Sequence, residues 1–319
     1  MNFEKNTKTR VANTDTIANK AGRGLGDLRI KQLCATLLVL LICVVSNTGR
    51  CGDLDEVLKA GKLRHLGIVY ANFVTEDKTG LDVELMQLFA AHLGVKYEFV
   101  ETNWTNILTD LTGKVIKPKG DDVEIMGTGP IRGDIIATGF TMLEWRKKVV
   151  DFSEMTFPTG VWLLARADSK LQPIVPTNTI TKDIEAVRKN LKDVSILGLQ
   201  GSCLDPSLYN LDTTGASIQL FPIDRDLSEM IPSMMAKQAN TTLMDLPVAL
   251  IALEDWPGQI KVIGPISDPQ IMACAFPKTS PKLRQEFNNF FNQCKADGTY
   301  KRLVEKYYSS LFVYYPDSF

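Results

Sequence analysis

Few residues of this sequence stand in the patterns that catalysis or metal binding requires. The two histidines, His65 and His92, lie in no cluster with Cys or Asp at metal-ligand spacing, so we expect no zinc site. The sequence contains no nucleophile elbow, no Walker loop and no dinucleotide-binding fingerprint. The residue types therefore favour non-covalent binding over catalysis, and we expect neither a metal nor a cofactor.

Cysteine is the residue type whose chemistry depends most on the cellular compartment. Of the six cysteines, Cys34 and Cys43 lie in an apolar run near the N-terminus. The other four are Cys51, Cys203, Cys274 and Cys294. Four cysteines allow three complete pairings, and two alternatives stay open. Either one disulfide forms, between Cys274 and Cys294 or involving Cys51, or these residues are small buried side chains.

The N-terminus has the pattern of an export signal. Residues 1–32 are polar and basic, and the apolar run LCATLLVLLICVV occupies residues 33–45. This run is shorter than the roughly 20 residues of a membrane span, and small residues follow it. We therefore predict a secretory signal peptide with a long basic segment over residues 1–49, and hence a periplasmic protein. An uncleaved membrane anchor and a translation start after Met1 are the alternatives.

The composition is that of an ordinary globular protein. The chain has 319 residues, of which 45% are hydrophobic and 23% charged, and its formal net charge is -1. This length favours two domains. The balanced charge offers no basic face, so we expect no nucleic-acid partner.

Helical and strand patterns alternate along the rest of the chain. Apolar residues at helical spacing predict a helix over residues 80–93, and the segment KYEFV predicts a strand over residues 96–100. Similar patterns predict strands over residues 63–69, 134–138, 161–165, 194–199, 242–245, 261–263 and 271–276. They predict helices over residues 53–61, 104–111, 143–150, 182–191, 227–239, 280–297 and 300–308. The alternation favours α/β architecture with mostly parallel sheets.

One segment, GKVIKPKGDDVEIMGTGPIR at residues 113–132, interrupts this alternation. It is rich in Gly, Pro and charge, and it is compatible with a hairpin that has Val123–Met126 in one arm. Long excursions of this kind are often functional. The segment is therefore either a tolerated surface insertion or a lid over a site.

Five segments, in this order, resemble the motifs of one known family: LKAGKLRHL at 58–66, GLDVELMQLFAAHLG at 80–94, WTNILTDL at 104–111, GDIIATGFTMLEWRKKVVDFS at 133–153 and GTYKRLVEKY at 298–307. The family is that of the bacterial extracellular solute-binding proteins, family 3, which includes the amino-acid-binding components of ABC importers. Each segment alone is a weak signal, but five in order at compatible spacing are specific. The resemblance covers about residues 53–310.

The resemblance implies a two-lobed, periplasmic-binding-protein-like fold of type II, also called a Venus flytrap. In that fold two α/β lobes are joined by two crossing strands, and the ligand lies between the lobes. The first lobe would be discontinuous, with residues 51–163 and 260–319. Residues 164–259 would form the second lobe.

The resemblance also assigns ligand-binding roles in the first lobe. Arg146, five residues after Thr141, matches the arginine that binds the ligand carboxylate, and a guanidinium fork suits that geometry. Gly139 would offer its carbonyl to the ligand ammonium, and Thr141 its hydroxyl and N–H to the carboxylate. The alternatives are that Arg146 is one more charge on a basic helix and that Thr141 caps this helix.

Two further positions lie in the second lobe. Ser202 and Cys203 follow a strand, where backbone N–H groups at a helix N-terminus would bind an anion. Cys203 stands where the family has threonine, which removes a hydroxyl donor. Asp245 matches the acid that pairs with the ligand ammonium, although Pro247 two residues later also fits a plain helix cap.

Tyr70 and Trp104 match the aromatic residues that sandwich the ligand side chain, although isolated aromatics are more often part of a core. Gly67 stands where relatives that select basic amino acids often carry an acid. Its lack of a charge argues against a site selective for lysine or arginine.

The implied function is capture of a small amino acid or related carboxylate, without catalysis, for an inner-membrane ABC permease. The protein would act as a monomer. One alternative is a periplasmic sensor or a module that binds peptidoglycan fragments, since membrane-bound lytic transglycosylases of the F type carry a related domain. Cyclohexadienyl and arogenate dehydratases also share the fold, but they use a glutamate where this chain has Val248, so we expect no such enzyme.

Overall fold

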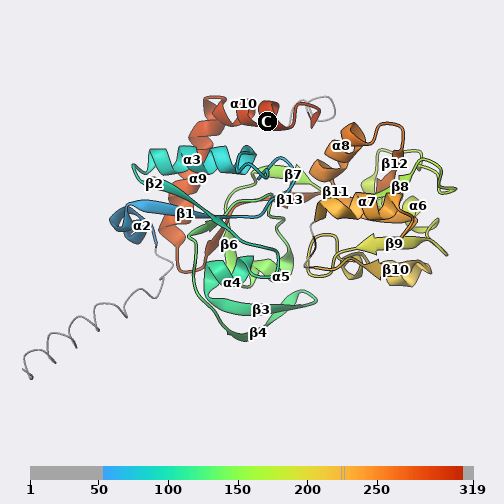
Figure 1. The fold of residues 1–319 in the computed structure, drawn as a ribbon, viewed down its shortest axis with the longest axis horizontal. Helices are drawn as coiled ribbons and strands as arrows, with labels where there is room; N and C mark the ends of the chain where they lie inside the picture. The colour runs from blue at the N-terminus through green and yellow to red at the C-terminus, as the bar shows by residue number, and fades with distance from the viewer. Residues whose placement is uncertain (1–52, 224, 226, 312–319) are drawn as a thin grey trace, which may run out of the picture. The chain divides into compact units, whose positions relative to one another are not determined.

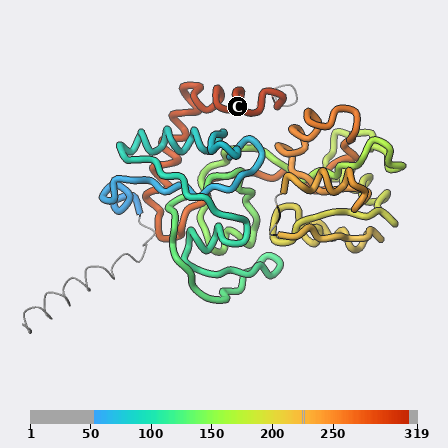
Figure 2. Tube along the Cα trace, in the orientation of Figure 1, coloured from blue at the N-terminus to red at the C-terminus, as the bar shows by residue number. Residues whose placement is uncertain are grey.

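Two mixed five-stranded sheets, each covered by helices, make up the part of the chain that the computed structural model describes, which is residues 53–223, 225 and 227–311. Figures 1 and 2 show the two sheets and the segments that join them. The expected signal peptide lies outside the described residues. Within the described part, no helix combines the length and the apolar character needed to cross a membrane.

The first sheet has the strand order β2-β1-β5-β14-β6. Its strands are β1 (Lys62–Gly67), β2 (Lys96–Glu101), β5 (Ile135–Ile136), β6 (Val150–Phe152) and β14 (Ala275–Pro277). β1 pairs in parallel with β2 and β5, whereas β14 is antiparallel to β5 and β6. The helices of this part are α2 (Leu54–Ala60), α3 (Leu81–His92), α4 (Ile107–Thr112), α5 (Glu144–Lys147), α9 (Pro281–Ala296) and α10 (Thr299–Tyr307).

The second sheet has the strand order β10-β9-β11-β8-β12. Its strands are β8 (Val161–Arg166), β9 (Ser195–Gly198), β10 (Ser217–Leu220), β11 (Thr241–Asp245) and β12 (Ile260–Pro265). Its α-helices are α6 (Ile180–Arg188), α7 (Met230–Met235) and α8 (Leu246–Asp255), and short 3-10 turns occupy Pro206–Tyr209, Leu211–Thr214 and Leu227–Glu229. β9 pairs in parallel with β10 and β11, and β8 is antiparallel to β11 and β12.

A two-stranded antiparallel ladder lies in the chain between the two sheets. β7 (Phe157–Thr159) pairs with β13 (Gln270–Met272); β7 leads into β8 of the second sheet, and β13 follows β12 of that sheet. β8 and β12 both belong to the second sheet, so residues 163 and 260, our expected lobe boundaries, lie inside its strands. We therefore place the change of lobe in the β7/β13 ladder.

The expected alternation of strands and helices is confirmed, but the sheets are not mostly parallel. In each sheet half of the strand pairs are antiparallel, because β8, β12 and β14 carry the chain out of one lobe and back into the other. The expected strand at 271–276 is two strands, β13 and β14. Helix α8 was not among the predicted helices, but the alternative that Asp245 and Pro247 mark a helix cap is confirmed, since Asp245 caps α8 and Pro247 lies in its first turn.

The excursion at residues 113–132 contains a hairpin. β3 (Lys114–Lys119) pairs antiparallel with β4 (Asp122–Thr128), and Ile116 faces Ile125 across the ladder. The expected arm Val123–Met126 lies in β4. Its side chains Ile125 and Met126 are exposed, so the hairpin contributes little to the core.

The alternative of a disulfide between Cys274 and Cys294 is wrong, since both thiols are free and buried. Cys203 is also free and buried. Cys274 and Cys294 belong to the hydrophobic core, where cysteine packs as a small apolar residue. Burial raises the pKa of the Cys294 thiol to about 11, which keeps it protonated and unreactive. A pairing through Cys51 lies outside the described residues.

Candidate ligand-binding site

The candidate ligand-binding residues follow the carboxyl ends of parallel strands in both sheets. In the first sheet they lie after β1, β2 and β5, and in the second sheet after β9 and at the end of β11. In α/β sheets of this kind ligands bind beyond the carboxyl ends of the strands. Strand direction therefore brings together residues that are far apart in the sequence.

Seven of the eight expected site residues line one small cavity: Tyr70, Trp104, Gly139, Thr141, Arg146, Ser202 and Cys203. The eighth, Asp245, accepts a hydrogen bond from the Tyr70 hydroxyl. The cavity has a volume of about 10 Å³, which is the space of a single water molecule. The side chains of the site thus fill the space between the two sheets themselves.

Arg146 is the buried cation of this cavity. Arg146 is 3% exposed. One of its guanidinium N–H groups donates to the Thr141 carbonyl at 2.8 Å, whereas Nε has no hydrogen-bond partner among the described residues. The guanidinium carbon lies 4.0 Å from the centre of the Phe140 ring, a cation–π contact. Burial lowers the pKa of Arg146 to about 10, so it remains a cation at neutral pH. An unpartnered donor on a buried cation is suited to an anionic ligand group.

The backbone at Gly139 is fixed by contacts that need glycine. Its φ is +60°, and a Cβ at this position would lie 2.4 Å from the Phe73 ring. Its N–H donates to the buried Asp82 carboxylate at 2.7 Å. Burial raises the pKa of Asp82 to about 7. Asp82 thereby positions the loop that carries Gly139 and Thr141.

Thr141 is not a helix cap, contrary to the alternative considered from the sequence. Helix α5 begins after Leu143, whose side chain makes no cap hydrogen bond. Thr141 instead forms an isolated bridge with Met272, and it lines the small cavity together with Cys203.

The loop after β9 uses most of its polar groups internally. The Ser202 hydroxyl donates to the Leu199 carbonyl at 2.9 Å and accepts from the Leu204 N–H at 3.0 Å. The Gly201 N–H donates to Asp205, which also caps the following 3-10 turn. The Cys203 thiol is buried, and this burial raises its pKa to about 12. In this arrangement Cys203 faces the cavity as a neutral thiol.

Asp245 has the capping role that the sequence suggested, and its second oxygen faces the first lobe. It is fully buried and caps α8, where one carboxylate oxygen accepts from the Val248 N–H at 3.3 Å. Its other oxygen accepts from the Tyr70 hydroxyl, which lies on the first lobe. Burial raises the pKa of Asp245 to about 6, while the hydrogen bond from Tyr70 opposes that shift. A buried carboxylate of this kind can pair with an ammonium group.

Tyr70 and Trp104 form an aromatic corner of the cavity. Their rings meet edge to face with centroids 5.4 Å apart, and Trp104 stacks with Phe140 at 6.4 Å. Tyr70 is buried, whereas Trp104 is partly exposed. Trp104 is thus the aromatic residue of the site that lies nearest to solvent.

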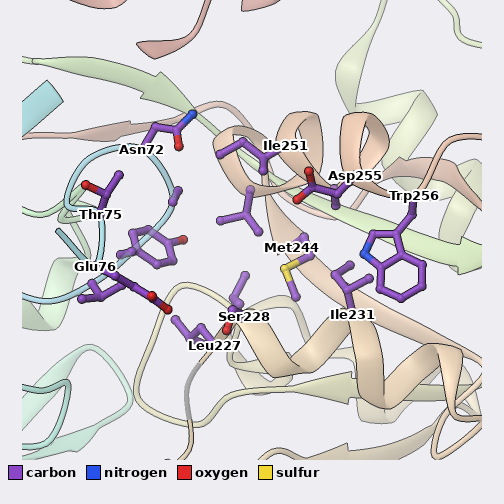
Figure 3. A pocket seen from close by; sticks show the side chains of 16 residues that line it. Asn72, Thr75, Glu76, Leu227, Ser228, Ile231, Met244, Ile251, Asp255 and Trp256 are labelled. Carbon is purple, nitrogen blue, oxygen red and sulfur yellow. The ribbon is translucent and has the colours of Figure 1, made fainter. Parts of the chain in front are cut away.

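Three larger cavities adjoin the small one. A cavity of about 320 Å³ shares Tyr70, Leu204 and Leu227 with it. Figure 3 shows this cavity, with Asn72, Thr75 and Glu76 on one side and Ile251, Asp255 and Trp256 on the other. A second cavity, of about 490 Å³, shares Trp104, and a third, of about 390 Å³, shares Ser202. Larger groups of a ligand would extend into one of these.

Sequence reasoning missed two residues. Asp82 positions the loop that carries Gly139, and Phe140 contacts the Arg146 guanidinium. An acid in the first turn of a helix usually matches the helix dipole, so nothing in the sequence marked Asp82 as buried. Phe140 lies between Gly139 and Thr141 and could have been included on that ground.

His65 has a structural role. Its ring nitrogens contact the Ala137 carbonyl at 2.6 Å and the Tyr97 hydroxyl at 2.8 Å, and burial lowers its pKa to about 4. The described residues include no group of three or more His, Cys, Asp or Glu side chains placed to hold a metal ion.

The sequence model of the bacterial extracellular solute-binding proteins, family 3, matches residues 70–116 and 125–310. The chain belongs to this family. The family-3 match covers most of both sheets but leaves out residues 117–124, the tip of the β3–β4 hairpin.

Among relatives of this family-3 protein is a membrane-bound lytic murein transglycosylase F of Desulfosudis oleivorans, 25% identical over 237 residues. The alignment covers 74% of this chain but 45% of that protein, so the chain spans less than half of its length. A probable amino-acid ABC transporter-binding protein of Haemophilus influenzae is 23% identical over 281 residues, with 86% and 95% of the two chains covered.

The fold is that of a solved amino acid-binding protein. The crystal structure of the ancestral protein AncCDT-1, a precursor of cyclohexadienyl dehydratase, is 27% identical and aligns with a TM-score of 0.61. The alignment covers 80% of this chain and 98% of the other. The expected two-lobed, type II periplasmic-binding fold is therefore confirmed, and this family-3 member is a solute-binding protein with amino-acid-binding relatives.

Proposed function

We propose that this protein binds a small amino acid or related carboxylate between its two lobes and delivers it to an inner-membrane ABC permease. The observation that carries the proposal is the buried Arg146 guanidinium, whose Nε is unpartnered and which lies in one cavity with Tyr70, the partner of Asp245. The name of the Haemophilus relative supports the transport role.

In this proposal the two charges of a zwitterion are divided between the two lobes. Arg146 of the first lobe binds the carboxylate through its guanidinium fork. Asp245 of the second lobe binds the ammonium group after the Tyr70 hydroxyl has moved away. A ligand that contacts both lobes stabilises their closed arrangement and shifts the population toward it. We propose that the protein works as a monomer and without a cofactor.

Arg146→Ala tests this proposal most directly. Removing one partner of a buried charge pair costs roughly 2–5 kcal/mol, so affinity should fall by about 30-fold or more at about 1.4 kcal/mol per tenfold. Isothermal titration calorimetry, with a ligand found by a thermal-shift screen of amino acids and dicarboxylates, gives the measurement.

Lys147→Ala is the matched control, because Lys147 lies on the same helix but is exposed and paired with Glu144. Its affinity should equal that of the unmodified protein. Arg146→Lys keeps the charge but loses the fork, so it should recover only part of the affinity. Unchanged affinity in Arg146→Ala would show that another group binds the carboxylate.

A dehydratase-like activity is the less favoured function. Val248 lines the cavity shown in Figure 3, and its side chain can neither donate nor accept a proton. We propose that the protein is not an enzyme, and turnover of prephenate by the unmodified protein would contradict this.

Binding of peptidoglycan fragments, or sensing of a ligand without transport, is the alternative within the same class of binding proteins. The likeness to a lytic murein transglycosylase F favours the former. Muropeptides and polyamines in the same thermal-shift screen distinguish this alternative from amino-acid binding. We further propose that residues 1–49 export the protein to the periplasm, which N-terminal sequencing of the exported protein would test.

A further inference from the structure

The match to the family model leaves out the tip of the β3–β4 hairpin. The model matches residues up to 116 and resumes at 125, so residues 117–124 lie outside the match. These eight residues start and end at a cross-strand pair, because Ile116 faces Ile125 in the ladder. They therefore form the outer end of the hairpin beyond that pair.

The hairpin tip, residues 117–124, meets the second lobe. Lys117, Pro118 and Gly120 line one side of the 390 Å³ cavity, whose other side is made of residues that follow β9 and β10. Pro118 Cγ lies 3.9 Å from the place that a Cβ on Gly201 would occupy. Figure 1 shows the hairpin extending toward the part of the second lobe that contains β9 and β10. The hairpin tip thus closes a chamber that a shorter hairpin would leave open.

The chamber adjoins the candidate site at its carboxylate end. Ser202 lines both spaces, and Trp145, the neighbour of Arg146 on α5, lines the chamber. Tyr70, Trp104 and Asp245 do not line it, and neither do Thr141 and Arg146. Because Ser202 lines both spaces and Trp145 is the neighbour of Arg146, a ligand held by Asp245 and Arg146 would reach the chamber from its carboxyl end.

The walls of the chamber are mainly apolar. Trp145 and Phe221 are buried, Leu208 is partly buried, and Leu220 and Ile223 are 53% and 47% exposed. Exposed apolar side chains around a pocket are typical of a binding surface.

Two charged side chains line the chamber, and they differ in their partners. Asp205 accepts hydrogen bonds from the Gly201 N–H and from the N–H and hydroxyl of Ser207, so its carboxylate is occupied. Lys117 is exposed and forms no ion pair with any residue in the described part of the chain. The chamber therefore offers apolar area together with one available positive charge.

We propose that this chamber binds the second residue of a peptide-like ligand, an amino acid extended through its carboxyl group by an apolar residue whose terminal carboxylate lies near Lys117. The proposal rests on the proposed amino-acid site and defines its ligand class more closely. Arg146 then binds the carbonyl between the two residues, and a free amino acid uses only the inner part of the site.

The test compares two ligand series on two proteins. The ligands are the twenty free amino acids and the twenty dipeptides that carry each of them before a C-terminal leucine. The proteins are the unmodified chain and a variant in which residues 117–124 are replaced by Asn-Gly. This two-residue turn suits a hairpin closed by a facing pair such as Ile116 and Ile125. Calorimetry gives the affinity of each combination.

For the preferred first residue, the dipeptide should bind the unmodified protein at least about tenfold more tightly than the free amino acid, the gain expected from burying a leucine side chain. The shortened hairpin should lose this gain and keep the affinity for the free amino acid. Lys117→Ala should weaken only the dipeptide, and Lys114→Ala, on the same hairpin but outside the chamber, should weaken neither. Leu220→Trp, which narrows the chamber from the second lobe, repeats the test if the shortened hairpin does not fold.

Two results would refute peptide binding in the chamber while leaving the proposed amino-acid site intact. One is equal affinity for dipeptide and amino acid. The other is a gain in dipeptide affinity that survives in both the shortened-hairpin and the Leu220→Trp variants. Failure of every ligand in both series to bind would refute the proposed function itself and this inference with it.

Discussion

Two buried charges, the Arg146 guanidinium and the Asp245 carboxyl group, determine what the candidate site can bind. Both groups are buried away from water. Burial lowers the pKa of Arg146 and raises that of Asp245, and each shift favours the neutral form. The shift leaves Arg146 charged at neutral pH, but it brings the pKa of Asp245 to about 6. Among the eight candidate residues, Asp245 is therefore the one whose charge depends on ordinary changes of pH.

We expect the affinity for an amino acid to rise with pH through about 6. Below the pKa of about 6 the Asp245 carboxyl group is protonated and cannot pair with an ammonium group; above it the carboxylate can. One pH unit below the pKa, about a tenth of the carboxyl groups are ionised, so affinity at pH 5 should be roughly tenfold weaker than at pH 7. Calorimetry across pH 5–8 gives this profile.

Asp245→Asn identifies the group responsible, since asparagine still caps α8 but carries no charge. The variant should bind weakly, and its profile should lose the step near pH 6. Asp82, with a pKa of about 7, holds the neighbouring loop, and any pH dependence left in Asp245→Asn belongs to it. A step near pH 6 that persists unchanged in this variant would exclude Asp245 as its origin.

At the scale of elements, the loop between β5 and α5 carries three of the expected site residues and is fixed by the first lobe. Gly139 adopts a left-handed conformation in contact with the Phe73 ring, and Asp82 of α3 holds its N–H. Arg146 in turn donates to the carbonyl of Thr141 in this loop. The conformation of the loop therefore depends on contacts from two helices.

Gly139→Ala should destabilise the protein by at least about 1 kcal/mol more than Gly61→Ala. Both glycines have positive φ, but a Cβ at Gly61 meets nothing within 4 Å, whereas at Gly139 it meets Phe73 at 2.4 Å. The difference between the two variants isolates the steric contact from the backbone strain. Urea denaturation monitored by tryptophan fluorescence measures both, and equal losses of stability would mean that the Phe73 contact relaxes without cost.

At the scale of the whole described chain, one hydrogen bond joins the two lobes at the centre of the site. Tyr70 of the first lobe donates to Asp245 of the second, and Thr141 and Cys203 line the cavity beside it. A hydrogen bond to a charged group contributes roughly 1.5–3 kcal/mol. The Tyr70–Asp245 hydrogen bond therefore favours the closed arrangement, and the Tyr70 hydroxyl competes with a ligand ammonium for Asp245.

Tyr70→Phe should accelerate alkylation of Cys203 by about tenfold or more, because losing a bond of this strength raises the open population by that factor. Cys203 is buried, with its thiol pKa raised to about 12, so it reacts only when the lobes separate. Labelling with a maleimide, followed by peptide mass spectrometry, gives the rate for each cysteine.

Cys274 and Cys294 are internal controls, since both are buried in the core of the first lobe and should react at unchanged rates. An increase shared by all three cysteines would indicate general destabilisation. Unchanged labelling of Cys203 would show that the Tyr70–Asp245 bond does not hold the lobes together.

Local signals in the sequence were sufficient for most elements. Asp53 and Gly61 mark the two ends of helix α2, and the apolar pattern before Gly94 predicted helix α3. They were insufficient for α8, which was not predicted as a helix although Asp245 and Pro247 fit a helix cap and first turn.

The sequence by itself determined the family, the alternation of elements and the choice of eight candidate site residues, because these depend on residue types at fixed spacing. Tertiary structure alone decided that seven of these candidates line one cavity, that Asp82 supports their loop and that the tip of the hairpin lines a chamber beside Ser202. Those contacts join segments up to 175 positions apart, as between Tyr70 and Asp245, and no local pattern specifies such distances. They follow from strand order and direction, which place the carboxyl ends of two sheets opposite one another.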